Sequence, residues 1–172
     1  MIAMHSDTPE ITDVNLAPGE FFFSGGYTRI HTLLGSCVAI TMWHPKESIG
    51  GMCHYLLPSR GLNQRLALGY YADEAVSMFL GEVYKANTKP FEYEVKVFGG
   101  GNMFEAYGNQ TNKLNVSQDN ISASANLLKL HGFKIKATDV GGAIHRKIFL
   151  ELWNGDVWVQ RGGKRETSGN AQ

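Results

Sequence analysis

Two adjoining apolar runs, separated by a short turn, limit most strongly what this chain can fold into. The first covers residues 37–43 (CVAITMW) and the second covers residues 49–57 (IGGMCHYLL). Both contain apolar and β-branched residues, and a proline follows each run within two positions. Such runs predict buried strands, and the five residues 44–48 are a suitable length for a β-hairpin connection. We therefore expect the two strands to pair.

Helical periodicity replaces this pattern in two places. Apolar residues recur every three or four positions across residues 72–86, which predicts an amphipathic helix. A second helix is expected to begin after Ser117 and to end at Gly132, because glycine readily adopts the left-handed cap conformation. Its predicted inward residues are Ile121, Ala125 and Leu128.

Shorter apolar or alternating segments predict the remaining strands. Asn154-Gly155, a strong signal for a two-residue hairpin turn, lies between the last two of them. The order of elements indicates an α+β fold, an α/β sandwich in which mixed β-sheet layers are covered by two main helices. These strands are expected over residues 21–23, 92–98, 133–140, 148–153 and 157–159.

Length and charge set the domain count and exclude some partners. The 172 residues, 43% of them hydrophobic, suffice for one domain, expected at residues 11–163 between a flexible arm (1–10) and a flexible tail (164–172). Lys plus Arg and Asp plus Glu both total 16, so no overall field attracts nucleic acid or an anionic membrane. No apolar window approaches the length of a membrane-spanning helix.

Cys37 follows Gly35 and Ser36, and three roles are open to it: lipid attachment, core filling or nucleophilic catalysis. The sequence LGSC resembles a lipidation box. However, residues 1–33 carry four acidic residues and a Pro-Gly pair, which a signal peptide lacks. The other two roles remain open. Without a secretory signal, we expect a cytoplasmic protein with reduced cysteines.

A nucleophilic cysteine needs a base, and His54 is the best placed histidine because its strand is expected to pair with the one that begins at Cys37. A neighbouring histidine lowers a thiol pKa from about 8.5. Cys53 adjoins His54, but consecutive strand residues point to opposite faces, so Cys53 should face the core. The backbone amides of Ser36 and Cys37 are candidates to stabilise a thiolate and an oxyanion. Thr32 is a candidate to orient the imidazole, with His31 as its rival.

Other chemistry is poorly supported. Gly99-Gly100-Gly101-Asn102 lacks both the third glycine of a dinucleotide loop and the lysine of a phosphate-binding loop, so it predicts tight packing or a cleft wall. A zinc site would need ligand pairs at recognised spacing, which are missing from the candidate set. We expect neither a cofactor nor a metal. The zinc candidates considered are Cys37, Cys53, His54 and His145.

Five segments, in order, resemble the CheD family of chemoreceptor glutamine deamidases. They are LGSCVAI, GGMCHYLLP, YADEAV, FGGGNMFE and DVGGAIHRKIFLELWNGDVWV, and the resemblance covers about residues 16–163. It implies a fold similar to deamidating toxin catalytic domains, with a cysteine, a histidine and a threonine in the site. The cysteine and histidine map onto Cys37 and His54. The threonine maps onto Thr32 after a one-residue shift, and His31 stands at the unshifted position.

The resemblance also implies the reaction and its partners. Glutamine side chains on methyl-accepting chemotaxis receptors would be hydrolysed to glutamate, with release of ammonia. For some family members, the resemblance also implies a CheC-type phosphatase as a partner and the hydrolysis of receptor methyl esters. Two other hypotheses stand beside it: a non-catalytic chemotaxis adaptor, and a thiol hydrolase that acts on small esters or amides.

Overall fold

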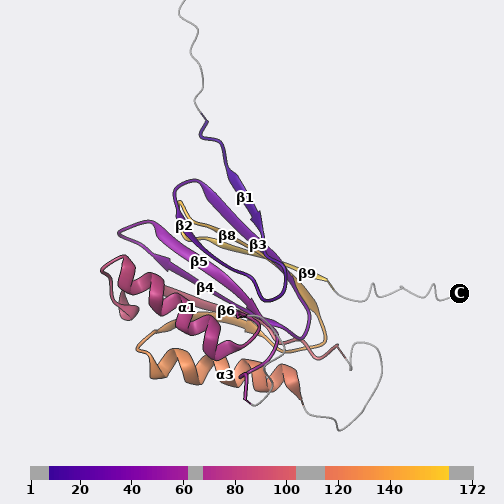
Figure 1. Cartoon of the computed structure of the whole chain (residues 1–172). Coiled ribbons are helices and arrows are strands. Elements are labelled where there is room, and N and C mark those ends of the chain that lie inside the picture. Colours follow the sequence, from indigo (N-terminus) through magenta and orange to yellow (C-terminus); the bar gives the residue numbers. More distant parts are fainter. Residues whose placement is uncertain (1–7, 62–67, 104–114, 163–172) are drawn as a thin grey trace, which may run out of the picture.

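The computed structural model describes residues 8–61, 68–103 and 115–162, whose strands form two sheets (Figure 1). The four-stranded sheet has the order β1-β3-β8-β9, and the five-stranded sheet has the order β2-β5-β4-β6-β7. β1 is parallel to β3 and β7 is parallel to β6, while the other pairs are antiparallel. The first sheet contains β1 (Thr12–Asn15), β3 (Thr28–Leu34), β8 (His145–Glu151) and β9 (Val157–Gly162). The second contains β2 (Phe21–Gly25), β4 (Val38–His44), β5 (Ile49–Tyr55), β6 (Glu94–Gly99) and β7 (Ile135–Val140).

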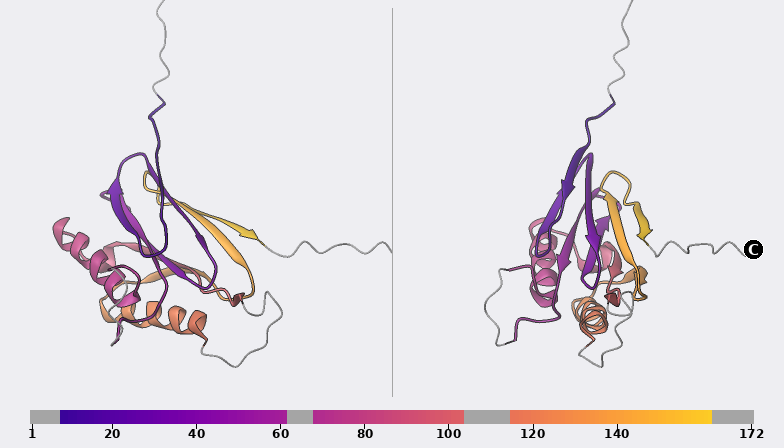
Figure 2. Two further views of the ribbon diagram at one scale, coloured as in Figure 1. Left: turned by 45° about the vertical axis from the view of Figure 1, so that its right-hand side comes forward. Right: turned by 90° about the vertical axis from the view of Figure 1, so that its right-hand side faces the viewer.

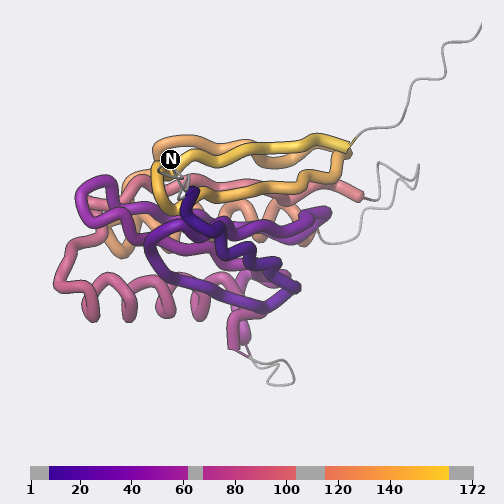
Figure 3. Tube along the Cα trace, turned by 90° about the horizontal axis from the view of Figure 1, so that it is seen from above, coloured from indigo at the N-terminus to yellow at the C-terminus, as the bar shows by residue number. Residues whose placement is uncertain are grey.

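The sheets pack face to face, and helices α1 (Ala72–Lys85) and α3 (Val116–Leu130) cover the outer face of the five-stranded sheet (Figures 1 and 2). Seen from above, β8 and β9 run side by side along one edge (Figure 3). This arrangement confirms the α+β fold with mixed sheet layers. The helix-side cluster lies under α1 and α3 and includes Val38, Ile40, Cys53, Phe79 and Leu128. The inter-sheet cluster includes Ile30, Ala39, Met52, Phe98 and Ile148.

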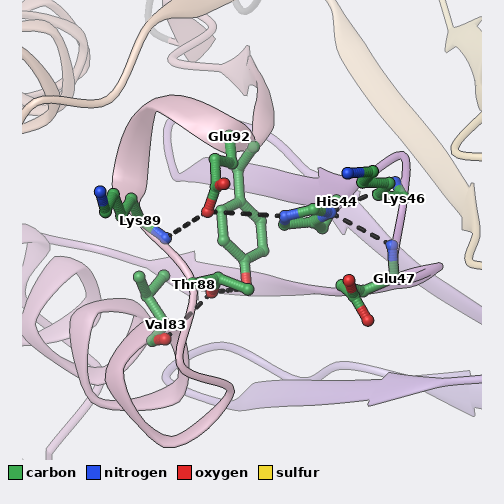
Figure 4. A network of polar contacts seen from close by, with 8 residues as sticks. His44, Lys46, Glu47, Val83, Thr88, Lys89 and Glu92 are labelled. Carbon is green, nitrogen blue, oxygen red and sulfur yellow. Dashed lines mark hydrogen bonds and ion pairs between the residues drawn. The ribbon is translucent and has the colours of Figure 1, made fainter.

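The predicted hairpin of β4 and β5 is confirmed. The two strands pair antiparallel over their whole length, from Val38 opposite Tyr55 to His44 opposite Ile49. The His44 imidazole fixes the turn, because its Nδ1 accepts from the backbone N–H groups of Lys46 and Glu47, each at 3.2 Å. Its Nε2 lies 3.7 Å from a Glu92 carboxylate oxygen in the short helix η1 (Pro90–Glu92) (Figure 4). The turn end of the hairpin is thus tied to the segment before β6.

Two strands escaped the sequence analysis, and one turn was wrong. β1 has a single apolar residue, and β3 alternates inward and outward with threonine at two of its four inward positions. The connection from β8 to β9 has five residues rather than the predicted two. The Trp43 indole lies against Gly155, where an added Cβ would come within 2.2 Å of its ring. This close contact, together with a φ of 76°, accounts for the glycine at position 155.

The helices agree with prediction in extent, and two of the three inward residues predicted for α3, Ile121 and Leu128, pack in the helix-side cluster. α1 spans nearly the predicted residues, and Gly132 has the expected positive φ of 82°. α3 begins two residues earlier than a start after Ser117, because the side chain of Asn115 accepts from the N–H of Gln118. Ala125 is exposed, so its predicted inward position is wrong. The buried residues of α3 are Ser117, Asn120, Ser124 and Leu128.

The proposed domain limits stay a prediction. Residues 8–10 are exposed and form no regular element, while residues 1–7 and the predicted tail at 164–172 lie outside the described residues.

Candidate active site

Cys53 and His54 point to opposite faces of β5, as the alternation of a strand requires. Cys53 is 1% exposed and belongs to the helix-side cluster. His54 is 2% exposed and reaches across the inter-sheet space to Thr32 of β3. The expected separation of the two neighbours is therefore confirmed.

A chain of hydrogen bonds orients the His54 ring. The Thr32 hydroxyl donates to the backbone carbonyl of Leu16 at 2.7 Å. Because that hydroxyl has one proton, its oxygen accepts from Nδ1–H of His54, also at 2.7 Å. Nε2 of His54 is then unprotonated, and it has no hydrogen-bond partner among the described residues. The chain of Leu16, Thr32 and His54 thus leaves the ring nitrogen of a general base free.

His31 lies on the other face of β3, away from this chain. Its Nε2 is 3.6 Å from the Asp13 carboxylate, and its ring lies 5.4 Å from that of Phe149. The structure therefore brings Thr32, and not His31, to His54.

Cys37 shares a face with His54. It immediately precedes β4, two residues before Ala39, which is opposite His54 in the β4–β5 register. Residues two apart in extended chain point the same way, and Cys37 does pack against the inter-sheet cluster. Diagonal pairs of this kind have Cα atoms about 7–8 Å apart. No hydrogen bond joins the thiol to Nε2 in this state, and such bonds often form only when substrate is present.

Burial leaves both groups neutral at pH 7. It lowers the pKa of His54 to about 4, and it raises the pKa of the Cys37 thiol. The Ser36 hydroxyl and the Cys37 backbone N–H both act to lower the pKa of that thiol, but burial outweighs them. In this state His54 is uncharged and does not lower the pKa of the Cys37 thiol.

The glycine-rich segment after β6 packs against the Cys37 turn, as predicted. The N–H of Gly100 donates to the Cys37 carbonyl, and that of Gly101 donates to the Gly35 carbonyl, each at 2.8 Å. Gly99 has φ 104°, and a Cβ on it would lie 2.2 Å from the Cys37 oxygen. Within the described part of the chain, no backbone or side-chain oxygen accepts a hydrogen bond from the N–H group of Ser36 or Cys37.

A zinc site does not form from the candidate ligands. Cys53 and His54 face opposite sides of the sheet, so they cannot hold one ion. Across the described ranges, no group of three His, Cys, Asp or Glu side chains could hold a metal.

Comparisons with known proteins identify the family of the chain. The family model described as CheD chemotactic sensory transduction matches residues 56–161. A protein of Pseudomonas syringae pv. tomato, named "Probable chemoreceptor glutamine deamidase CheD", is 45% identical over 148 residues, which cover 86% of this chain and 88% of that one. The chain belongs to the CheD family.

More distant members align over similar lengths. "Probable chemoreceptor glutamine deamidase CheD 3" of Dechloromonas aromatica is 42% identical, over 91% of each chain. A Leptospira interrogans relative, "Probable chemoreceptor glutamine deamidase CheD 1", is 36% identical over 88% of this chain and 93% of that one. Among solved structures, the hypothetical protein YfiH of Bacillus licheniformis aligns with a TM-score of 0.49 at 10% identity, over 72% of this chain and 51% of that chain. None of the described helices of this CheD-family chain is long and apolar enough to cross a membrane.

Two participants were missed in the sequence. Leu16 contributes only its backbone carbonyl, so no side-chain pattern could have marked it. Asn120 contacts the Cys37 turn from α3, and its Nδ2 lies 3.4 Å from the Ser36 carbonyl. A polar residue at an inward helical position was the signal for it, one turn after Ser117.

Proposed function

We propose that this chain is a protein-glutamine deamidase of chemotaxis receptors, with Cys37 as nucleophile and His54 as general base. The CheD relatives carry this activity in their names. The observation that supports the mechanism best is the hydrogen-bond chain through Thr32, which leaves Nε2 of His54 free on the face that Cys37 shares. Cys37 is also partly exposed, so a substrate can reach it.

The first step forms a thioester. The Cys37 thiol gives its proton to Nε2 of His54 as the sulfur attacks the glutamine carboxamide carbon. The N–H groups of Ser36 and Cys37 donate to the oxyanion that develops. The imidazolium keeps its Nδ1–H on the Thr32 oxygen, and its Nε2–H then protonates the departing nitrogen, which leaves as ammonia.

The second step restores the thiol. His54, neutral again, takes a proton from water, and the hydroxide adds to the thioester carbon. The tetrahedral intermediate collapses with loss of the Cys37 sulfur, which recovers its proton from His54. The products are ammonia and a glutamate side chain.

The substrates are the methyl-accepting chemotaxis proteins, whose glutamine side chains are presented on folded helices. Receptor helices face the cytoplasm, and the two free cysteines suit that compartment, which supports a cytoplasmic location for the enzyme. A CheC-type phosphatase partner and methyl-ester hydrolysis remain predictions from the family resemblance.

Mass spectrometry of co-expressed receptors tests the proposal. Wild-type protein should convert specific receptor glutamines to glutamate, each with a gain of about one mass unit, and release ammonia. Cys37→Ala should abolish conversion, whereas Cys53→Ala, on the opposite face, should retain it. Conversion by folded Cys37→Ala would exclude the nucleophile.

The other hypotheses give different results in the same experiment. A wild-type protein that binds receptors without releasing ammonia would be an adaptor. Hydrolysis of small esters without conversion of receptor glutamine would identify a different thiol hydrolase.

A further inference from the structure

The inner face of α3 carries buried polar residues beside the apolar ones that pack on the sheet. Ser117, Asn120 and Ser124 are all buried there, and Asn120 is completely inaccessible. α3 lies below the five-stranded sheet (Figure 1), close to the loops around Cys37. Buried polar side chains on this face call for an explanation, because their burial opposes folding unless each one forms hydrogen bonds.

These side chains bind backbone carbonyls of the site loops. Asn120 Nδ2 donates to the Leu56 carbonyl at 2.8 Å and lies 3.4 Å from the Ser36 carbonyl. Ser117 Oγ donates to the Gly101 carbonyl at 2.8 Å. Asn120 thereby joins the end of β5, which carries His54, to the turn that carries Cys37.

Tyr55 fixes Asn120 in turn. Its hydroxyl donates to the Asn120 backbone carbonyl at 2.5 Å, and Tyr55 is itself fully buried opposite Val38. The opposite orientation of the Asn120 amide is excluded, because Oδ1 would then face the two carbonyls to which Nδ2 now donates.

The contact with Ser36 determines where the Cys37 N–H points. In a trans peptide, the carbonyl of one residue and the N–H of the next point in opposite directions. An Asn120 side chain that holds the Ser36 carbonyl toward α3 therefore directs the Cys37 N–H away from α3. The Gly35 carbonyl, held by the Gly101 N–H, orients the Ser36 N–H in the same way.

We propose that Asn120 is a positioning residue that aligns the Cys37 N–H with the oxyanion of the reaction. The inference rests on the deamidase function proposed above. Asn120 does not touch the substrate and acts through the Ser36 carbonyl. Its Oδ1 has no hydrogen-bond partner among the described residues, although it is buried. An asparagine with one half of its amide unpaired favours stability less than an apolar side chain would, which fits a residue kept for its effect on the Cys37 turn.

Two measurements on Asn120→Ala separate positioning from stability. Deamidation passes through an oxyanion, whereas alkylation of Cys37 by iodoacetamide does not. We expect kcat for deamidation to fall about tenfold to hundredfold, because one donor is misaligned. The alkylation rate at high pH, where the thiol is fully ionised, should stay within about twofold of wild type, because that plateau needs no oxyanion donor. The pH midpoint of alkylation should rise, because the Cys37 N–H no longer supports its own thiolate.

Ser122→Ala is the control on the same helix. Ser122 is exposed on α3, two residues from Asn120, and its hydroxyl accepts from Gln118 Nε2 at 3.5 Å, away from the Cys37 turn. Both kcat and the alkylation midpoint should match wild type in this variant.

Three results would overturn the inference. They are an unchanged kcat in folded Asn120→Ala, an equal loss in kcat and in the alkylation plateau, and a failure of both Asn120→Ala and Asn120→Ser, which keeps a hydrogen-bond donor, to fold, which would make the residue structural. Failure of the proposed function is distinct, because the wild type itself would then release no ammonia.

Discussion

The two faces of the five-stranded sheet differ in what they bury. Toward the helices the sheet presents Val38, Ile40 and Cys53, an apolar surface covered by α1 and α3. Toward the four-stranded sheet it presents Ala39 together with the polar His54, whose ring meets Thr32 from the opposing layer. Both faces are built from the same two strands, and residues adjacent in sequence are divided between them.

The comparison teaches that burial alone does not decide whether a cysteine is inert. Burial raises the pKa of both thiols, and it raises that of Cys53 to about 12. At Cys37 the Ser36 hydroxyl opposes that rise, and an unprotonated imidazole nitrogen lies on the same face. At Cys53 only backbone N–H groups oppose it. The polar surroundings and the partial exposure of Cys37 together distinguish the two sites.

The largest expected effect is the difference in thiol reactivity between the faces. In the folded protein at pH 8, iodoacetamide should modify Cys37 on the order of a thousandfold faster than Cys53, because Cys53 is sealed and almost wholly protonated. A time course followed by peptide mass spectrometry measures both rates. In urea the two rates should become similar. Comparable alkylation rates of Cys37 and Cys53 in the folded protein would show that the two faces do not differ in thiol reactivity.

The second effect is on stability in acid. The pKa of His54 is about 4 in the folded protein and 6.5 when unperturbed. Above pH 6.5 the ring is neutral in both states, whereas below it the unfolded chain takes up a proton that the folded chain does not. The free energy of unfolding should therefore fall by on the order of 3 kcal/mol between pH 6.5 and pH 4 through this residue alone.

Urea titrations of wild type and His54→Gln across that pH range isolate this contribution. The variant should lose less stability in acid than the wild type. Parallel pH dependences in the two proteins would show that the ring is not buried in its neutral form.

The smallest expected effect is on kcat/KM, in variants of two threonines that point into the inter-sheet space. Thr32→Val removes the acceptor for Nδ1–H of His54, so kcat/KM for deamidation should fall about tenfold to hundredfold. Thr41 lies two residues after Ala39 on β4, and its hydroxyl donates to the Lys96 carbonyl at 3.4 Å. Thr41→Val should therefore keep kcat/KM within about twofold. Similar losses in both, measured as ammonia release from a receptor cytoplasmic fragment, would assign Thr32 a packing role.

The sequence predicts those parts of the fold that depend on local pattern. The hairpin of β4 and β5 follows from two apolar runs and a short turn, and the division of Cys53 from His54 follows from the two-residue period of a strand. Both depend only on residues close together in the chain. The motif order at residues 16–163 also sufficed to indicate the family.

The remaining features depend on contacts between distant segments. β3 was missed because its inward threonines read as polar, although Thr32 is inward in order to meet His54 from another sheet. Ile121 and Leu128 were predicted correctly on the inner face of α3, but its buried polar residues were missed because they bind carbonyls of distant loops. The raised thiol pKa reflects the depth of Cys37, which no spacing of residues reveals.

Thr32 and His54 belong to different sheets, and the 2.7 Å contact between their side chains spans the boundary between the two layers. A slip of one layer over the other by even an ångström would break this contact. The aliphatic packing around Ile148, directly opposite Thr32 in the register, therefore sets the alignment of the proposed general base. The orientation of the His54 imidazole therefore depends on how accurately the two sheets pack against each other.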